Sequence, residues 1–206
     1  MKIKKLIAVL LAVVLATASV MSVSAATLSD VTPENSMEVT ANIVDPGYVS
    51  YVITIPDTAD FGTLTQPDNT DTDHYAFFDF NVEATELNIK NNQGVTVYMK
   101  DSTSQDGQFY ITQKNELIDN PFTMSYDVYD TSVNSGNIDS YGAINTSSVP
   151  GTYGYHLCTF LYGADGETQP VTLALNQNAL VGRTISDIAG DYSGTITFHS
   201  ALIERG

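Results

Sequence analysis

The sequence predicts an all-β protein, an antiparallel β-sandwich of about nine or ten short strands with Greek-key connections. Three observations carry this prediction. Runs of alternating apolar and polar residues recur along the chain, turns with glycine or proline separate them, and no stretch after the N-terminal region has a convincing helical period. Alternation with a period of two is what a strand needs when one face is buried and the other is wet.

The first 25 residues are predicted to be a secretory signal peptide. Three lysines form a basic tip, residues 6–20 are almost entirely apolar, and residues 23–25 supply the small side chains that a signal peptidase needs. We expect cleavage after Ala25, with Ala26 as the alternative. A membrane anchor is the competing interpretation, but the run is short for a bilayer span and the cleavage pattern follows at once.

The mature part, residues 26–206, is predicted to be a single acidic domain. Removal of three lysines from the eight basic residues leaves five against 24 acidic ones, a formal charge of −19. Nucleic acid and anionic membranes are therefore poor partners, and no later stretch is apolar enough to span a membrane. Cys158 is the only cysteine. An internal disulfide is excluded, so the apolar core must hold the exported fold.

In chain order, the polar residues 27–34 are expected to be loosely structured, and the first strand signal is Met37–Ile43. A turn at Asp45-Pro46-Gly47 leads into a β-branched and aromatic strand over residues 48–55. We expect the two strands to pair as a hairpin. The alternative is that residues 37–43 add to the open edge of a neighbouring molecule.

The middle of the chain carries four more strand signals. Residues 78–89 alternate, and Asn91-Asn92-Gln93-Gly94 is expected to turn them into a hairpin with residues 95–100. Shorter runs follow at residues 109–111 and 122–128.

The weakly patterned residues 131–150 are predicted to be a surface excursion with at most a short strand near Ile144. Strands are expected at residues 153–162 and 171–175. Residues 178–188 suit either a short helix or an extended crossing, and the pattern leaves this open.

The last strand signal, residues 195–203, alternates most clearly and follows a glycine-bounded turn. Ile196, Phe198 and Leu202 share one predicted face, and Thr195, Thr197 and His199 share the other. An apolar face on a terminal strand is useful only if an assembled sheet covers it. We therefore expect Ile196 and Phe198 to face the core. The pattern does not exclude a closed barrel in place of the sandwich.

Two segments carry a family resemblance: residues 51–62, YVITIPDTADFG, and residues 190–198, GDYSGTITF. Together they resemble the opening and closing strands of small secreted β-sandwich surface proteins of Gram-positive bacteria, the WxL-like and pilus-like group. The resemblance implies an extracellular domain without catalysis, used in surface layers, adhesion or fibre-like assemblies. The fold class expected from the strand pattern is a Greek-key, immunoglobulin-like sandwich. The chain has no tryptophan, so the Trp-x-Leu wall-attachment motif is absent, and no functional residue is transferred.

One pair of residues could suggest nucleophilic catalysis. His156 and Cys158 are two apart on a predicted strand and should share a face. Their Cβ atoms would stand about 7 Å apart, too far for direct proton transfer, so a buried structural cysteine is the favoured interpretation. No catalytic motif with a nucleophile elbow, phosphate loop or paired metal-binding cysteines occurs, and we expect no catalytic or cofactor-binding residue.

An acidic loop offers weak calcium candidates, Asp68, Asp71 and Asp73, at the spacing of hard oxygen ligands. The glycine and the closing glutamate of the helical calcium hand are missing. A solvated acidic loop without a metal is therefore the favoured interpretation.

Twelve tyrosines without a tryptophan raise the question of sugar binding, because exposed aromatic faces stack on sugar rings. Four tyrosines lie on predicted strand faces opposite to the apolar runs: Tyr98, Tyr110, Tyr129 and Tyr162.

These observations predict a secreted bacterial cell-surface or extracellular-matrix protein that is structural or adhesive and not an enzyme. Other surface proteins or cell-wall and host glycans are the expected partners, with self-assembly as a further option. A carbohydrate-binding module is the alternative, and a hydrolase is a distant third.

Overall fold

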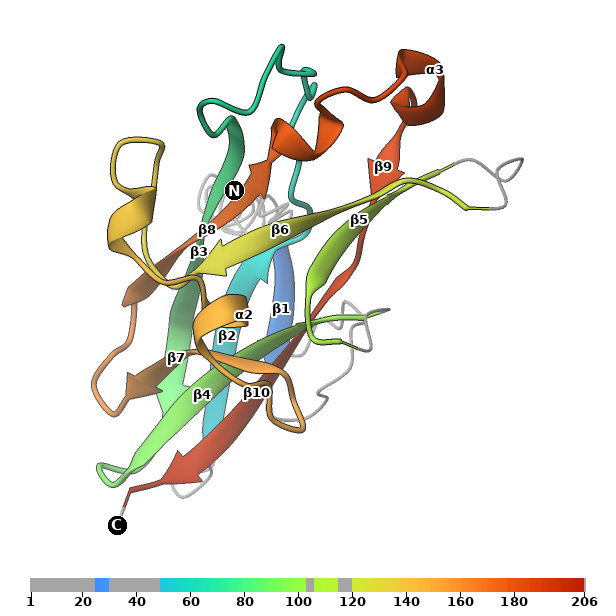
Figure 1. The fold of residues 1–206 in the computed structure, drawn as a ribbon. Helices are drawn as coiled ribbons and strands as arrows, with labels where there is room; N and C mark the ends of the chain where they lie inside the picture. Colours follow the sequence, from blue (N-terminus) through green and yellow to red (C-terminus); the bar gives the residue numbers. More distant parts are fainter. Residues whose placement is uncertain (1–24, 30–48, 103–105, 115–119, 206) are drawn as a thin grey trace, which may run out of the picture.

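The chain folds into two sheets of antiparallel strands, which the computed structural model in Figure 1 shows. The structure describes residues 25–29, 49–102, 106–114 and 120–205. The larger sheet contains, in spatial order, β1 (Ala25–Ser29), β2 (Ser50–Pro56), β3 (Tyr75–Asn88), β8 (Thr168–Asn176), β6 (Thr123–Tyr129), β5 (Phe109–Gln113) and β9 (Tyr192–Ser193). The smaller sheet contains β10 (Ile196–Glu204), β4 (Gln93–Asp101) and β7 (Tyr155–Leu161). A mostly antiparallel β fold is thus confirmed.

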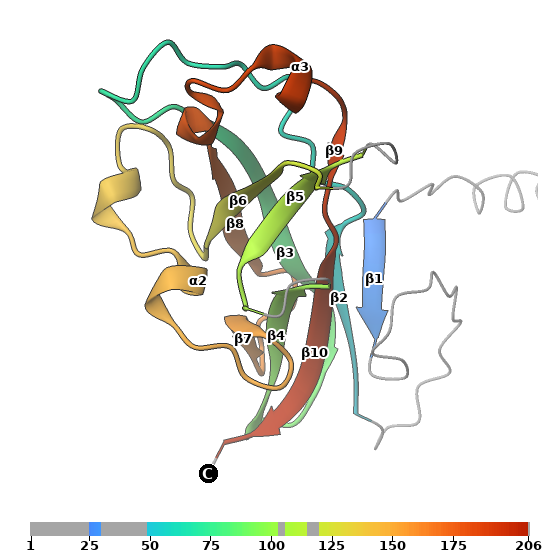
Figure 2. The same cartoon turned by 45° about the vertical axis from the view of Figure 1, so that its right-hand side comes forward.

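The larger sheet curls into a half-barrel, with the smaller sheet beside its lower end in Figure 2. Helical turns in the described residues are confined to connections: η1 (Ile138–Ser140), α2 (Ile144–Ser147), η2 (Gln177–Leu180) and α3 (Ile185–Ile188). Residues 178–188, which the pattern left open, therefore contain short helical turns. Helices in the described part of the chain fall short of the length and apolarity needed to cross a bilayer.

Both sheets contribute to one apolar core. Strand β2 shows the expected alternation, with Tyr51, Ile53 and Ile55 buried and the residues between them half-buried. Val97 and Met99 of β4 come from the other sheet and are fully buried in the same cluster. Each such side chain contributes about 1.5–3 kcal/mol of transfer free energy when it leaves water.

The predicted hairpin between residues 78–89 and 95–100 is wrong. Strand β3 pairs with β2 and β8 in the larger sheet, whereas β4 pairs with β10 and β7 in the smaller one. The turn between them is closed by the Gln93 N–H, which donates to the Lys90 carbonyl at 2.8 Å. A turn of this composition reverses the chain but does not dictate which strands pair, and here it carries the chain from one sheet to the other.

The N-terminal strands also differ from the prediction. Residues 27–29, expected to be loosely structured, belong to β1, which pairs with β2 from Ser29 opposite Val52 to Ala25 opposite Pro56. An edge strand is held by backbone pairing and needs no apolar alternation of its own. The predicted strand Met37–Ile43 lies outside the described residues. Its predicted partner β2 has β1 on one edge and β3 on the other, so the expected hairpin has no vacant edge on β2.

Residues 131–150 cover the outer face of the larger sheet. Val133, Ile138 and Ala143 pack with Tyr129 and Ala174 in a second, smaller apolar cluster.

The short strand expected near Ile144 is wrong, because residues 144–147 form the single turn α2. This turn places the Asn145 side chain so that its Oδ1 accepts a hydrogen bond from the Val128 N–H at 3.0 Å. Strand β5 begins opposite Tyr126 and does not reach Val128, so Asn145 supplies the hydrogen-bond partner that β5 does not provide there.

The C-terminal ribbon joins the two sheets. Strand β9 pairs with β5, and β10 pairs with β4, with only two residues between them (Figure 2). A Cβ atom on Gly194 would overlap with the carbonyl oxygen of Tyr110, so only glycine allows this close crossing. The Ser102 N–H then donates to the Thr195 carbonyl at 2.9 Å and fixes the start of β10.

The faces of β10 follow the predicted alternation over most of its length. Ile196 and Phe198 are half-buried against the main core, and the Phe198 ring meets that of Phe80 edge-on at 6.2 Å. Further along, Ser200 is buried and lies 3.3 Å from the Tyr51 hydroxyl. Leu202, predicted to face inward, is 38% exposed because β10 is an edge strand and its far end is little covered by described residues.

Candidate functional sites

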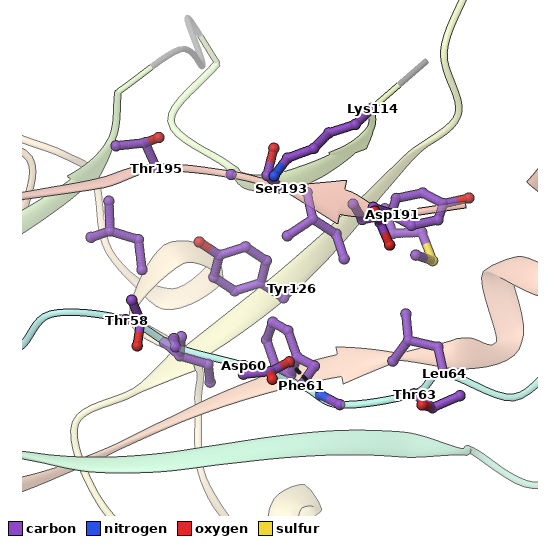
Figure 3. Close-up of a pocket in the computed structure, with 18 of the residues that line it drawn as sticks. Thr58, Asp60, Phe61, Thr63, Leu64, Lys114, Tyr126, Asp191, Ser193 and Thr195 are labelled. Atoms are coloured by element: carbon purple, nitrogen blue, oxygen red, sulfur yellow. Dashed lines mark hydrogen bonds between the residues drawn. The ribbon is translucent and has the colours of Figure 1, made fainter. Parts of the chain in front are cut away.

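A cleft of about 1150 Å³ opens where the half-barrel fails to close. Two extended segments wall it: residues 56–64, which continue from β2, and residues 189–198, which contain β9 and the start of β10. Figure 3 shows the two chains facing each other, with Phe61 and Tyr126 between them.

The floor of the cleft is apolar. Ile111, Met124, Leu173 and Phe198 reach it from four different strands. Phe61 leans over this floor with its ring centroid 5.6 Å from that of Tyr126, edge to face. Burial, with a smaller contribution from Asp101, raises the pKa of Tyr126, which keeps its phenol neutral.

The rim of the cleft is polar and mostly acidic, with Asp57, Asp60 and Asp191 and one basic residue, Lys114. The Asp60 carboxylate accepts a hydrogen bond from the Gly62 N–H at 2.8 Å, which shapes the loop. An apolar floor with a polar rim is typical of a ligand-binding cleft.

Two hydrogen bonds at one end of the cleft anchor the 56–64 wall. The Thr65 N–H donates to the Gln177 side chain at 2.7 Å, and the Gln66 amide donates to the Leu180 carbonyl at 2.7 Å. These bonds tie the loop to η2 and hold the wall in place.

A second candidate site is an aromatic platform on the outer face of the smaller sheet, made of Tyr98, Tyr153, His156 and His199. Tyr98 stands on the central strand β4, directly opposite His199 of β10 and His156 of β7. Its ring centroid lies 6.1 Å from that of His156 and 6.4 Å from that of His199. Tyr153, from the turn before β7, stacks on His199 at 3.8 Å with an interplanar angle of 9°.

The platform is open to solvent and surrounded by hydroxyl groups. Tyr153 is 47% exposed, and His156 Nε2 lies 3.0 Å from the Thr159 hydroxyl. On the other side the Thr197 and Ser102 hydroxyls are 2.6 Å apart. Burial lowers the pKa of His199, and the Lys100 ammonium adds to this effect, so its ring is neutral at physiological pH.

The other tyrosines chosen from the sequence do not join the platform. Tyr110 donates its hydroxyl hydrogen to Asp106 at 2.7 Å, and this bond raises its pKa. Tyr129, expected to be exposed, is buried in the second cluster because residues 131–143 cover it, and burial raises its pKa to about 12. Tyr162 is 60% exposed but stands apart in the turn after β7.

The prediction that His156 and Cys158 share a face is wrong. Tyr98 lies opposite His156 whereas Val97 lies opposite Cys158, so a β-bulge adds Leu157 to strand β7. His156 therefore points outward and Cys158 inward, where the thiol is buried. Burial raises the pKa of Cys158 to about 12, as expected for a structural cysteine and not for a nucleophile.

In the acidic loop, the Asp73 side chain binds residues of β8 and η2. The Asp73 carboxylate accepts from the side-chain amides of Asn176 and Asn178 at 3.1 and 3.0 Å. Asp68, Asp71 and Asp73 do not gather, since no group of three or more metal-binding side chains occurs within the described ranges.

Comparison of the chain with models of protein families, with curated proteins and with solved structures gave no match.

Proposed function

We propose that the protein is a secreted bacterial cell-surface or matrix protein, structural or adhesive and without catalysis, whose adhesive face is the aromatic platform. The proposal includes removal of residues 1–25 on export, an immunoglobulin-like sandwich with Greek-key connections, and kinship with the WxL-like and pilus-like surface proteins. Its expected ligands are cell-wall or host glycans.

The main support for this proposal is the stacked pair of Tyr153 and His199. The C–H faces of a sugar ring pack against exposed aromatic faces, and nearby hydroxyls and imidazole nitrogens bind its hydroxyl groups. Because His199 already supports the Tyr153 ring, less side-chain entropy is lost when a ligand stacks on it.

The charge of the chain narrows the class of glycan. A mature chain with a formal charge of −19 repels anionic polysaccharides over most of its surface. Neutral glycans are therefore the favoured ligands.

A glycan array and pull-down with neutral polysaccharides test this function. We expect Tyr153→Ala to weaken binding about fivefold, since one stacked ring is worth about 1 kcal/mol and a factor of ten in Kd takes about 1.4 kcal/mol. Tyr162→Ala is the matched control, because that ring is more exposed and lies outside the platform. A parent that binds no glycan, or equal losses in the two variants, would contradict the proposal.

A carbohydrate-binding module is the second candidate, and the same platform favours it. A module of this kind retains soluble oligosaccharides of one polysaccharide, whereas an adhesive protein retains whole cells or matrix. Binding of the labelled protein to intact cells, competed by soluble oligosaccharides, distinguishes the two.

A further inference from the structure

One side of the cleft is bounded by a strand edge that pairs with no other described strand. Within the described ranges, strand β9 ends the larger sheet and pairs only with β5. Tyr192 lies opposite Gln113, whose own N–H donates to the carbonyl of Phe122, the residue before β6, at 2.9 Å. In an antiparallel pair the peptide groups of successive residues alternate between the two sides, so those of Tyr192 point away from β5. They face the side on which the cleft lies.

The opposite wall is also extended chain outside any sheet. Thr58 and Ala59 are exposed and make no backbone hydrogen bond to another described residue. Two backbones therefore face each other across an apolar floor, which is the arrangement left when one strand of a barrel is missing.

One segment of this chain has the pattern of the missing strand. Residues 37–43, MEVTANI, alternate apolar and polar side chains, and lie outside the described residues. Their predicted partner β2 is occupied on both edges by β1 and β3. Met37, Val39, Ala41 and Ile43 thus need another sheet edge with an apolar floor below it, and the cleft offers both.

Chain length favours the cleft of another molecule over the segment's own. Ser29 lies opposite Val52, so residues 30–48 leave and rejoin the fold at the Ser50 end of β2, whereas the cleft begins at the Pro56 end. The stretch from Ile43 to Ser50 spans at most about 25 Å, and β2 alone takes about 20 Å of it. A strand laid in its own cleft would need both tethers almost fully stretched, which is entropically costly.

We propose that residues 37–43 of one molecule bind as an added strand in the cleft of a second copy, against β9 and over the floor that includes Met124 and Leu173. Donor segment and acceptor cleft are different surfaces, so the contact is head to tail and repeats into an open chain of molecules. This inference is independent of glycan binding, which uses the opposite face of the smaller sheet.

A mixing experiment on the mature chain tests this assembly. The donor variant is Val39→Asp, which places a charge on the apolar face of the segment. The acceptor variant is Phe61→Asp, which places a charge over the cleft floor from a half-buried loop position. We expect the parent to form oligomers by size-exclusion chromatography with light scattering, more so at high salt because the acidic copies repel each other. Each variant alone should be monomeric.

An equal mixture of the two variants separates assembly from misfolding. The donor variant keeps an intact cleft and the acceptor variant keeps an intact segment, so the mixture should form a dimer that neither forms alone. Tyr162→Asp, an exposed change outside both surfaces, should assemble like the parent. A parent that stays monomeric at every salt concentration, variants that still oligomerise, or a mixture without dimer would overturn the proposal.

Discussion

The cleft and the aromatic platform lie on opposite faces of the same strand and use aromatic residues in opposite ways. On β10, Phe198 points to the cleft and the core, whereas His199 points to the platform. The cleft hides its rings between two backbones, while the platform presents its rings to water among hydroxyl groups. This difference is the reason that we propose a peptide strand as the ligand of the cleft and a sugar ring as the ligand of the platform.

Gly194→Ala should abolish both sites at once and have the largest effect. The added methyl group overlaps with the Tyr110 carbonyl at the crossing between β9 and β10, so the ribbon has to move. We expect a loss of about 4 kcal/mol or more in the free energy of unfolding. Denaturant unfolding measures it, with Gly142→Ala as control, because a Cβ there meets only an ordinary contact with Ser147. Equal stabilities of the two variants would show that the crossing is not tight.

Phe198→Ala should lower the stability of the fold, because it removes packing on the inner face of β10, and should leave the aromatic platform on the outer face intact. Phe198 is half-buried and packs edge-on against Phe80, so we expect a loss of about 2–3 kcal/mol, below the usual cost for a fully buried phenylalanine. His199→Ala on the outer face should cost less stability but weaken glycan binding. Thermal melts and glycan-binding assays on both variants measure these two effects. A Phe198→Ala variant with the same Tm as the parent would show that the Phe198 ring does not contribute to core packing.

Protonation of His199 at low pH should produce the smallest change in stability, and this change arises at the platform. Burial and Lys100 lower the pKa of His199 below its usual 6.5, so the folded state takes up this proton less readily than the unfolded state. The resulting stability is present above about pH 6.5 and is lost as the pH falls towards and below the folded pKa. His199→Gln should therefore show a smaller drop in Tm between about pH 7.5 and about pH 5 than the parent. An unchanged drop would assign the pH dependence to other groups.

The sequence predicted those features that depend on neighbours along the chain. The alternation of Ile196 and Phe198 with Thr197 and His199 predicted the two faces of β10, and the same reasoning placed Tyr98 on an outer face. A period of two reports only which side of a strand a residue occupies, and that side is set locally.

Features that depend on strand pairing could not be predicted in this way. The bulge that separates His156 from Cys158 arises from the register between β7 and β4. For Tyr153 to stack on His199, the turn before β7 must reach over β4 towards β10. The cleft walls, residues 56–64 and 189–198, meet only through the curl of the larger sheet. A local sequence pattern does not predict such arrangements, because they depend on contacts between distant parts of the sequence.

The position of the C-terminal ribbon has a consequence for the timing of folding. Ile196 pairs with Asp101, and Tyr75 pairs with Asn176, so each sheet is joined by residues about a hundred positions apart. Closing such long loops makes folding slow, on the scale of milliseconds to seconds, because the larger sheet needs β9 and the smaller sheet needs β10 before it is complete. If the protein is exported as proposed, this delay would keep the nascent chain unfolded while it crosses the membrane, and folding would follow export.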